Sequence, residues 1–498
     1  MFQNSSGISR LVLVGALFAV TACSKAPSEP GSTREEASAQ EAASERAEKP
    51  NILFILTDDL GFNQVGAYGQ TQIHTPTLDE MAAEGIRFTQ AYAGNTVCSP
   101  SRVSLFTGRD GRGLHSNSNK IKLRKHDVTF AHVLKKAGYD TGLFGKYSIG
   151  QNDDLAETGP LKMGFDTWYG MDHIIEGHRQ HPTFLWDDDE KITIDANLEG
   201  KKGVYAQERF TEETIQFIRQ DRDVPFFAFL AYSSPHAELA APQEFVDQYS
   251  GKFEETAYTG MATGEPADKY ATYYPEPVDE PNATMAAMIT ALDAYIGEIL
   301  QVLEEEGLAD NTIIFFSSDN GPHDEGGADP DFFEASRPYK GMKRDLYDGG
   351  IHVPMIVRWR AGIMNPRVDD TPWAFADVLP TFAELADISL DSVPGVMIDG
   401  TSIAQILNDS PQEIPERLMY WEFGKQAGDP NSGVIGQIIQ AARLGDWKAV
   451  RYDLDMDVEL YNITEDPGEE SNLAAAKPEV TEKFYRLFEE NLADNNDE

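Results

Sequence analysis

Cysteine is nearly absent from this chain. Cys23 and Cys98 are the only two among 498 residues, so at most one disulfide bond can form. This count excludes a disulfide framework of the kind that holds small secreted domains together. The stability of the fold must therefore come from a hydrophobic core, and the chain is long enough to bury one large domain and a smaller one.

Positive charge is also scarce. The chain has 41 Lys and Arg against 83 Asp and Glu, which gives a net charge of −42 and a pI near 4.5. Such a surface repels nucleic acid and acidic lipid at long range, so neither is expected as a partner. An anionic substrate would need cations placed close to it. High salt would screen the overall field, and the composition fits a saline habitat as well as an ordinary acidic secreted protein.

Near the N-terminus the apolar run is short. It extends from Leu11 to Val20, follows Arg10, and ends in small residues before Cys23. A run of this length is typical of an export signal and is too short to span a membrane. Its ending, Val-Thr-Ala-Cys, looks like a bacterial lipobox. We therefore expect an exported bacterial lipoprotein, in the periplasm or at the cell surface, which contacts the membrane only through a lipid on Cys23. An ordinary signal peptide is the alternative.

The sequence divides into four parts. Residues 1–22 are the predicted signal peptide, and 23–49 form a tether rich in Ser, Ala, Glu and Pro. Over 50–400, apolar runs typical of doubly buried strands alternate with amphipathic helical patterns. This alternation predicts an α/β fold with a large, mainly parallel sheet sandwiched by helices. Over 401–498, short turn-separated runs predict a smaller C-terminal subdomain with an antiparallel sheet.

The expected elements have definite places. Strands are expected at 51–56, 141–144, 225–232, 312–317, 353–359, 437–443, 447–452 and 460–463. Helices are expected at 77–85, 128–138, 283–306 and 478–491.

The segment 97–109 is the most specific in the chain. Cys98 precedes Pro100 and Arg102, and Gly108 follows a short apolar run. Proline suits the first turn of a helix and glycine suits its end, so Cys98 is expected at a helix N-terminus, where anions bind. The neighbouring guanidinium is expected to favour a reactive thiolate. Taken without its neighbours, Cys98 would be read as a buried residue at the start of a core helix.

The pattern Cys-x-Pro-Ser-Arg, with Thr-Gly-Arg downstream, resembles the signature of the type I, formylglycine-dependent sulfatases, which are arylsulfatase-like members of the alkaline phosphatase superfamily. The resemblance implies that a formylglycine-generating or sulfatase-maturating enzyme oxidises Cys98 to formylglycine. The hydrated aldehyde would then be the nucleophile in sulfate ester hydrolysis. The resemblance extends from about Asn51 to near the C-terminus, where Gly445 to Lys448 and Glu459 to Tyr461 resemble the C-terminal subdomain of sulfatases.

Acidic or amide residues follow two of the predicted strands, as Asp58 and Asp59 and as Asp319 and Asn320. Ligands bind beyond the carboxyl ends of strands in open α/β sheets, and oxygen ligands suit Ca²⁺ or Mg²⁺. Either pair alone would be read as a helix cap or a turn. The resemblance implies that the four residues and Cys98 hold a divalent cation, Ca²⁺ rather than Mg²⁺. It also implies that Asp319 accepts the proton of the nucleophile.

Sulfate ester cleavage also needs cations around the sulfate oxygens and an acid for the leaving oxygen. The resemblance assigns sulfate binding to Lys146 and Lys343, beside Arg102 of the Cys98 motif, and protonation of the leaving group to His236. Taken singly, Lys146 would be read as a loop lysine and His236 as a structural histidine.

The chain departs from the family pattern at Ser148. The family usually has a histidine there, which is thought to act on the covalent sulfate, and serine cannot act as a base near neutrality. Candidate replacements are His323, His115 and His74. Two further differences, Asp348 for the usual Glu and His352 for the usual Arg, are interpreted as structural.

Two long segments, 151–203 and 236–280, are interpreted as inserted loops that shape the substrate pocket. A polar loop is favoured over a zinc site for the histidines of the first segment, which are His173, His178 and His181. The tyrosines of the second segment suit either sugar stacking or interior packing, and they are Tyr249, Tyr258, Tyr270, Tyr273 and Tyr274.

The leading hypothesis is a sulfatase acting on a sulfated polysaccharide or oligosaccharide. One alternative is a phosphodiesterase or phosphonate monoester hydrolase of the same superfamily, because phosphate and sulfate esters present similar tetrahedra. The other alternative is a non-catalytic glycan-binding relative, for which Ser148 is the only support.

Overall fold

In the computed structural model the chain divides into two units, Met1–Glu48 and Lys49–Glu498. The structure describes six ranges of the second unit, which are 49–112, 121–149, 155–172, 176–408, 414–424 and 438–492. The predicted signal peptide, Cys23 and nearly all of the tether lie outside the described residues. Export and lipidation therefore stay predictions, and so do the boundaries between the four parts of the chain.

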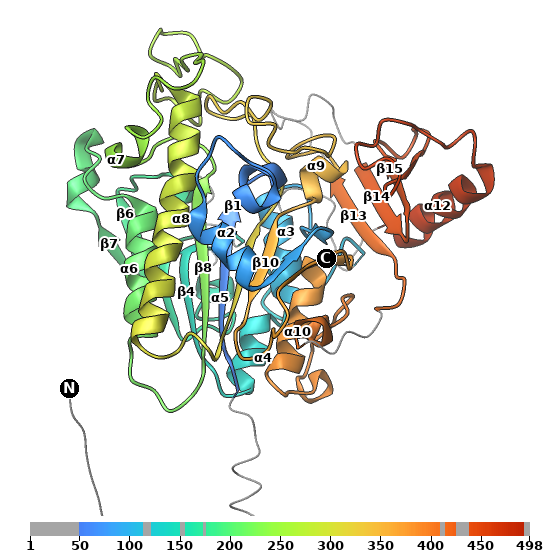
Figure 1. Ribbon diagram of the computed structural model, residues 1–498, viewed down its shortest axis with the longest axis horizontal. Coiled ribbons are helices and arrows are strands. Elements are labelled where there is room, and N and C mark those ends of the chain that lie inside the picture. Colours follow the sequence, from blue (N-terminus) through green and yellow to red (C-terminus); the bar gives the residue numbers. More distant parts are fainter. Residues whose placement is uncertain are drawn as a thin grey trace, which may run out of the picture. The chain divides into compact units, whose positions relative to one another are not determined.

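The main sheet has ten strands in the order β11-β2-β10-β9-β1-β8-β4-β5-β6-β7 (Figure 1). Its parallel middle consists of β9 (Thr312–Ser318), β1 (Asn51–Asp58), β8 (Phe226–Pro235), β4 (Asp140–Lys146) and β5 (Thr167–Met171). One edge consists of β10 (Met355–Arg358), β2 (Ile86–Phe88) and β11 (Arg367–Asp369), and the other of β6 (Phe184–Asp187) and β7 (Glu190–Thr193). A separate pair joins β3 (Ala91–Tyr92) to β12 (Trp373–Ala374).

Helices cover both faces of this sheet. One face packs against α2 (Pro76–Glu84), α6 (Ala206–Ile218) and α8 (Pro281–Glu305). The other face packs against α3 (Cys98–Thr107), α4 (Phe130–Lys136) and α10 (Val378–Leu385). Short helices lie in the connections, and they are α5 (Leu155–Thr158), α7 (Gln243–Val246), α9 (Asp348–Ile351) and α11 (Ala404–Leu407).

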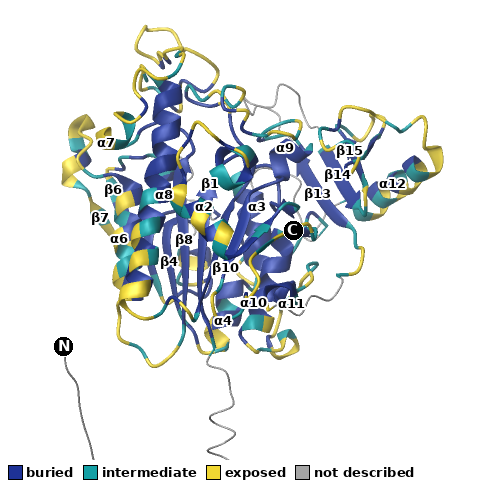
Figure 2. Cartoon of the chain, viewed as in Figure 1, coloured by how far each residue is buried: buried dark blue, intermediate teal, exposed yellow. Residues whose placement is uncertain are grey.

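Strand β1 shows no alternation of apolar and polar residues because both of its faces are buried. Successive side chains of a strand point to opposite faces of the sheet. Phe54 therefore packs in the cluster that contains α3, α4 and α10, whereas its neighbours Leu53 and Ile55 pack in the cluster that contains α2, α6 and α8. Both faces are buried, as the dark blue strands of Figure 2 show, so apolar residues are needed at every position.

Helix α8 is long and apolar enough to cross a membrane by length and composition alone. Its most apolar window is nevertheless 72% buried inside the protein, against the sheet and against α6. Among the described residues it is therefore a core helix of the large domain.

The C-terminal part forms the predicted antiparallel sheet. Its strands are β13 (Met419–Gly424), β14 (Ile438–Leu444), β15 (Trp447–Arg451) and β16 (Glu459–Asn462), and α12 (Pro478–Asn491) packs against them. The fold class is thereby confirmed, and all expected strands and helices are present within a few residues of their predicted bounds.

A buried ion network joins this small sheet to the large domain. Lys448 of β15 is fully buried, with its Nζ 2.6 Å from Asp348 Oδ1 and 2.9 Å from Glu469 Oε1. Asp348 begins α9 and also accepts a hydrogen bond from Tyr92 Oη, at 3.0 Å. Burial tends to raise the pKa of Asp348, but the charge of Lys448 and contacts with His352 hold it well below its usual value. Asp348 and His352 are thus structural, as predicted.

The interpretation of residues 151–203 as an inserted loop is wrong. This segment was interpreted as an inserted loop, but it contributes β5, β6 and β7 to the main sheet. The strands are short, and apart from the buried Leu185 the side chains of β6 and β7 are intermediate or exposed, which weakens the hydrophobic signal that predicts a strand.

Candidate active site

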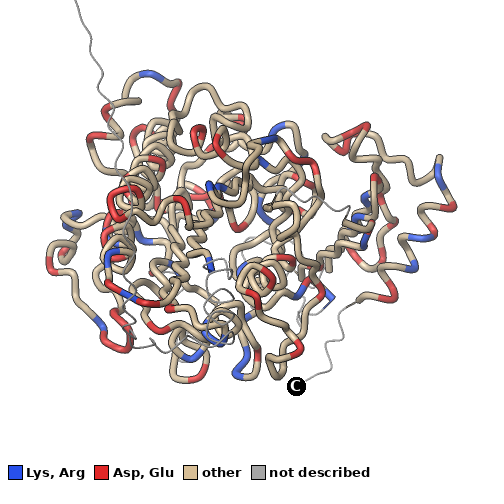
Figure 3. Tube along the Cα trace, turned by 60° about the horizontal axis from the view of Figure 1, so that its bottom comes forward, with Lys and Arg blue, Asp and Glu red and all other residues tan. Residues whose placement is uncertain are grey.

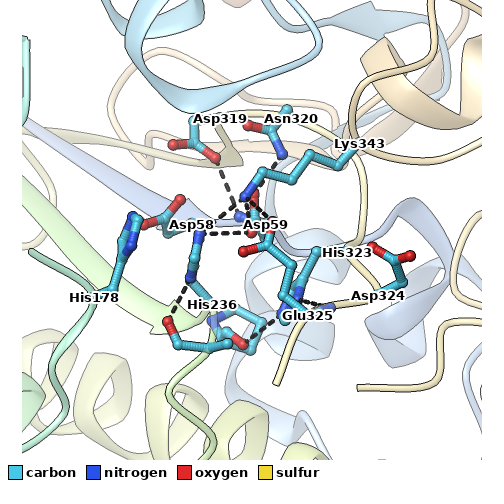
Figure 4. A network of polar contacts seen from close by, with 12 residues as sticks. Asp58, Asp59, His178, His236, Asp319, Asn320, His323, Asp324, Glu325 and Lys343 are labelled. Carbon is cyan, nitrogen blue, oxygen red and sulfur yellow. Dashed lines mark hydrogen bonds and ion pairs between the residues drawn. The ribbon is translucent and has the colours of Figure 1, made fainter. Parts of the chain in front are cut away.

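The site begins where two neighbouring parallel strands end. β1 and β9 pair in register up to Thr57 and Ser318, so the residues that follow them meet at the same edge. The backbone N–H of Asp59 donates to Asp319 Oδ1 at 3.1 Å, and Asn320 Nδ2 donates to Asp59 Oδ1 at 2.6 Å. Asp59 has a φ of 65°, an uncommon backbone conformation for a residue other than glycine, and one that clusters at functional sites. Figure 4 shows these side chains converging.

Helix α3 brings Cys98 to this edge. The helix begins at Cys98, as the sequence predicts, and ends at Gly108 in the left-handed conformation. One side-chain ligand atom each of Cys98, Asp58 and Asp319 lies within 4.8 Å of the others. Burial raises the pKa of the Cys98 thiol despite the nearby charge of Lys146. This direction is opposite to the one expected from the neighbouring guanidinium, because the loss of solvent outweighs the neighbouring cations.

Arg102 lies one helical turn after Cys98 and is tied to both sides of the site. Its Nε donates to Asp319 Oδ2 at 2.8 Å, and its NH1 group donates to the carbonyl of Lys146 at 2.6 Å. The remaining NH2 group is buried and has no hydrogen-bond partner among the described residues. A buried guanidinium N–H without a partner is costly, and an anion bound in front of it would satisfy it.

Two lysines and a histidine complete the positive groups. Lys146, at the end of β4, forms an ion pair with Asp58. Lys343 Nζ lies 2.7 Å from Asp59 Oδ2 and 2.9 Å from the Nε2 of His236, which follows β8 (Figure 4). Burial, followed by the charge of Lys343, lowers the pKa of His236 well below its usual value.

These cations are shielded from the acidic surface of the protein. Acidic residues are spread over the helices and loops (Figure 3), whereas Arg102, Lys146 and Lys343 are 1%, 0% and 6% exposed. Charges in a low-dielectric interior interact far more strongly with a bound anion than charges in solvent do. The site can therefore attract an anion despite the net charge of −42.

The oxygen atoms of the site fit a divalent cation. Asp58 Oδ1 and Asn320 Oδ1 are buried and have no hydrogen-bond partner among the described residues. Burial and the charge of Asp58 raise the pKa of Asp319 to about 7, which reflects the crowding of carboxylates. Three carboxylates and an amide offer the hard oxygen ligands that Ca²⁺ and Mg²⁺ prefer, and a cation between them would relieve the repulsion.

We predict that Ca²⁺ stabilises the protein. At a hundredfold excess over its Kd the cation should add about 2.7 kcal/mol to the free energy of unfolding. Thermal unfolding of chelator-treated protein, with and without added Ca²⁺ or Mg²⁺, measures this. The shift should be lost in an Asn320→Leu variant, and the absence of a shift with either cation would contradict the assignment.

Three further residues of the site were not recognised in the sequence. Glu325 accepts from Arg344 at 2.7 Å and lies 3.1 Å from Lys343 Nζ. His178 stacks on His236 with ring centroids 3.8 Å apart, and Tyr274 donates to Glu325 Oε2 at 3.0 Å. The sequence carries an indirect signal for His178 and Tyr274, namely the histidine and tyrosine clusters in the two long segments, and none for Glu325.

The other candidate histidines lie at different places in the structure. His323 stacks on the opposite side of His236, with centroids 5.3 Å apart. His74 packs against Tyr249, outside the described contacts of the site, and His115 lies outside the described residues. His173 is also outside them, so the zinc alternative is not tested. Ser148 is buried beside the site, and its Oγ has no hydrogen-bond partner among the described residues.

The tyrosines of segment 236–280 divide into two groups. Interior packing accounts for the buried ones, which are Tyr249, Tyr258, Tyr270 and Tyr274. Tyr273 is 41% exposed, so part of its side chain is accessible to solvent.

Known proteins resemble this chain over most of its length. Residues 50–388 match the family model described as Sulfatase, and residues 341–497 match the model described as N-sulphoglucosamine sulphohydrolase, C-terminal. An N-acetylgalactosamine-6-O-sulfatase of Bacteroides thetaiotaomicron is 26% identical, with 89% of this chain and 93% of the relative covered. The human N-acetylgalactosamine-6-sulfatase is 29% identical, with 82% and 72% covered. The crystal structure of Ps i-CgsB in complex with k-i-k-neocarrahexaose superposes with a TM-score of 0.71 at 24% identity, covering 90% and 93% of the two chains.

Proposed function

Because the chain belongs to the sulfatase family, and is thus a sulfuric ester hydrolase, we propose that it hydrolyses sulfate esters on a sulfated polysaccharide or oligosaccharide. The nucleophile is residue 98 after oxidation of Cys98 to formylglycine, whose hydrated aldehyde supplies a hydroxyl group. The raised pKa of the Cys98 thiol supports this, since the unmodified thiol would be a poor nucleophile in this setting.

One observation carries the proposal. Buried cationic, acidic and amide groups from five separate segments meet around residue 98. Several of their polar atoms have no hydrogen-bond partner among the described residues, among them Arg102 NH2, Asp58 Oδ1 and Asn320 Oδ1. Buried polar groups are nearly always satisfied in folded proteins. Unsatisfied donors and acceptors gathered in one place therefore point to a bound anion and a bound cation.

The roles of the residues follow from their charge and position. Arg102, Lys146 and Lys343 bind the sulfate oxygens and stabilise the charge that develops on them in the transition state. His236 lies against Lys343 and Asp59, on the side where the leaving group departs, and donates a proton to the leaving oxygen. Burial and the charge of Lys343 lower the pKa of His236, and the negative charge of a bound sulfate would raise it toward the protonated form that donates.

Asp58, Asp59, Asp319 and Asn320 are the residues that would hold the divalent cation. When bound, such a cation polarises a sulfate oxygen and lowers the pKa of the attacking hydroxyl group. Asp319 is held by Arg102 Nε and is placed to accept the proton of the nucleophile. Ca²⁺ is proposed over Mg²⁺, because the donors are oxygens of carboxylates and an amide on several segments, a flexible set of the kind that Ca²⁺ accepts.

A carbohydrate substrate is supported by the relatives. Two of them are named for sulfatase activity on N-acetylgalactosamine, and a structural neighbour was crystallised with a neocarrahexaose. The exposed ring of Tyr273 and the guanidinium of Arg344 over the ring of Tyr270, 5.4 Å from its centroid, belong to the segments around the site. Aromatic rings and Arg are suited to sugar faces and hydroxyl groups.

We further propose that the protein is an exported lipoprotein anchored through Cys23, and that it is matured by a formylglycine-generating or sulfatase-maturating enzyme. The proposal rests on the sequence of residues 10–23 and on the Cys98 motif. Labelling with a radioactive fatty acid, with a Cys23→Ala control, tests the anchor.

The phosphodiesterase alternative is tested with two nitrophenyl esters. Two lysines and one arginine can bind either tetrahedral group, so the substrate decides between the hypotheses. We expect kcat/KM for 4-nitrophenyl sulfate to exceed that for bis(4-nitrophenyl) phosphate by more than about tenfold, or 1.4 kcal/mol in transition-state stabilisation. Faster turnover of the diester would favour the alternative, and turnover of neither would favour a glycan-binding protein.

A further inference from the structure

His178 is a partly buried imidazole beside the site, and the proposed reaction gives it no role. It ends a short 3-10 helix, Glu176–His178, in the segment that was interpreted as a loop. Its ring lies on that of His236 with an interplanar angle of 14° and a centroid separation of 3.8 Å. The two imidazole rings are therefore in direct face-to-face contact. Figure 4 shows the two side chains next to Asp58.

The hydrogen bonds around His178 determine which of its nitrogens carries the proton. Burial tends to raise the pKa of Glu325, but Lys343 and Arg344 hold it well below its usual value, so Glu325 is an ionised acceptor. Tyr274 Oη therefore uses its proton to donate to Glu325 Oε2. Tyr274 Oη also lies 3.3 Å from His178 Nδ1. Because its proton is already donated to Glu325, Tyr274 Oη can only accept a hydrogen bond from this nitrogen. Nδ1 consequently carries the hydrogen, and Nε2 presents a lone pair.

This Nε2 is buried and has no hydrogen-bond partner among the described residues. Burial, together with His236, Lys146 and Lys343, lowers the pKa of His178 well below its usual value, which keeps the ring neutral. A lone pair repels the negatively charged oxygens of a sulfate group. The group that it can bind is a hydroxyl, which donates its proton.

The backbone of Gly177, next to His178, packs closely against Ser148 and Lys146. A Cβ atom at Gly177 would lie 2.7 Å from Ser148 Oγ and 3.4 Å from Lys146 Cγ. The segment that carries His178 is therefore pressed against residues of the site. The small side chain of Ser148 makes room for this approach, which a larger residue at position 148 would obstruct.

We propose that His178 Nε2 accepts a hydrogen bond from a substrate hydroxyl group adjacent to the sulfate ester, so the preferred substrates are sugars with a free hydroxyl on the carbon next to the sulfated one. The inference rests on the proposed function, in which His236 donates to the leaving oxygen. The two imidazoles stack with centroids 3.8 Å apart, which is close enough for them to reach oxygens on adjacent carbons of one sugar ring. His236 then donates a proton to the leaving oxygen, while His178 accepts a hydrogen bond from the hydroxyl group on the adjacent carbon.

The test compares two kinds of substrate. One is the monosulfated methyl glycoside that the wild-type protein hydrolyses fastest, and the other is 4-nitrophenyl sulfate, which has no hydroxyl next to its ester. His178→Ala and His178→Phe should lower the ratio of the two kcat/KM values by about 10- to 100-fold, the effect of leaving one buried hydrogen bond unmade. His178→Phe keeps an aromatic ring against His236, so it separates loss of the nitrogen from loss of the stack.

His323→Ala is the matched control. Its ring stacks on the other side of His236, but both of its nitrogens are engaged by the backbone, at Pro235 O and Glu325 N. It should lower both kcat/KM values by the same factor. If the His178 variants behave in this way too, His178 only supports His236 and the proposal is overturned.

A change in the substrate tests the same hydrogen bond on the wild-type protein. The glycoside whose vicinal hydroxyl is replaced by hydrogen should be hydrolysed with a kcat/KM lower by about 10- to 100-fold, and His178→Phe should cause little further loss on it. Equal turnover of the hydroxyl and deoxy glycosides would refute the proposal. Failure to hydrolyse any of the sulfated glycosides or 4-nitrophenyl sulfate would instead refute the proposed function, so the two failures are distinguishable.

Discussion

A Cys98→Ala variant is expected to lose sulfate ester hydrolysis while keeping its fold. Removal of a covalent nucleophile typically lowers kcat by about 10⁵-fold or more, because the other groups of the site have no attacking atom to assist. The fold should tolerate alanine, which is a good helix former, at the first position of α3. The measurements are kcat/KM with 4-nitrophenyl sulfate and the midpoint of thermal unfolding.

The chain supplies a matched control, because it has only one other cysteine. Cys23→Ala should leave turnover of the purified protein unchanged, and should remove only the proposed lipid anchor. Activity of the Cys98→Ala variant close to that of the wild-type protein would eliminate residue 98 as the nucleophile.

Mass analysis of the peptide that contains residue 98 tests directly whether Cys98 has been converted to formylglycine. Conversion of the thiol to an aldehyde removes about 18 Da, whereas ordinary thiol oxidation adds oxygen. An active preparation in which the peptide has the mass of unmodified cysteine would contradict the proposed formylglycine.

A Lys448→Met variant is expected to be the most destabilising change outside the active site. Lys448 is fully buried between Asp348 and Glu469, and methionine of similar length would leave both carboxyl groups without their cation. Breaking a buried ion pair by removal of one partner costs about 3–5 kcal/mol of the free energy of unfolding. Denaturant unfolding, followed by tryptophan fluorescence, measures the loss.

The variant with all three changes, Lys448→Met, Asp348→Asn and Glu469→Gln, tests the stated cause. If unpaired charge is what destabilises the protein, neutralising both carboxyl groups should recover a large part of the loss, because the three residues are coupled. A Lys448→Met protein as stable as the wild-type protein would show that the network does not hold the small sheet to the large domain.

Sequence reasoning succeeded where neighbouring residues determine the outcome. The start of α3 at Cys98 and its end at Gly108 follow from local conformational preferences. β1 could be recognised because a strand covered on both faces needs apolar residues at every position. The edge strands β6 and β7 were missed because partial exposure weakens that requirement.

The same division applies to the site. Asp58, Asp59, Asp319 and Asn320 were found because they follow recognisable strands, and parallel strands place their carboxyl ends along one edge of the sheet. The protonation state of the site could not be found in this way. The thiol of Cys98 was expected to have a lowered pKa, but its burial, which depends on the whole fold, raises the pKa instead.

The amino-acid sequence by itself determined the chemistry that this protein performs, since the residue types of the Cys98 motif and of the strand ends are set by the reaction and occur in short stretches. Only the tertiary structure decided what surrounds the leaving group. His178, Tyr274 and Glu325 come from segments far apart along the chain, and their contacts depend on how the long connections pack over the sheet. No local pattern encodes such contacts, because each of the three residues would be compatible with an ordinary surface loop if its partners were absent.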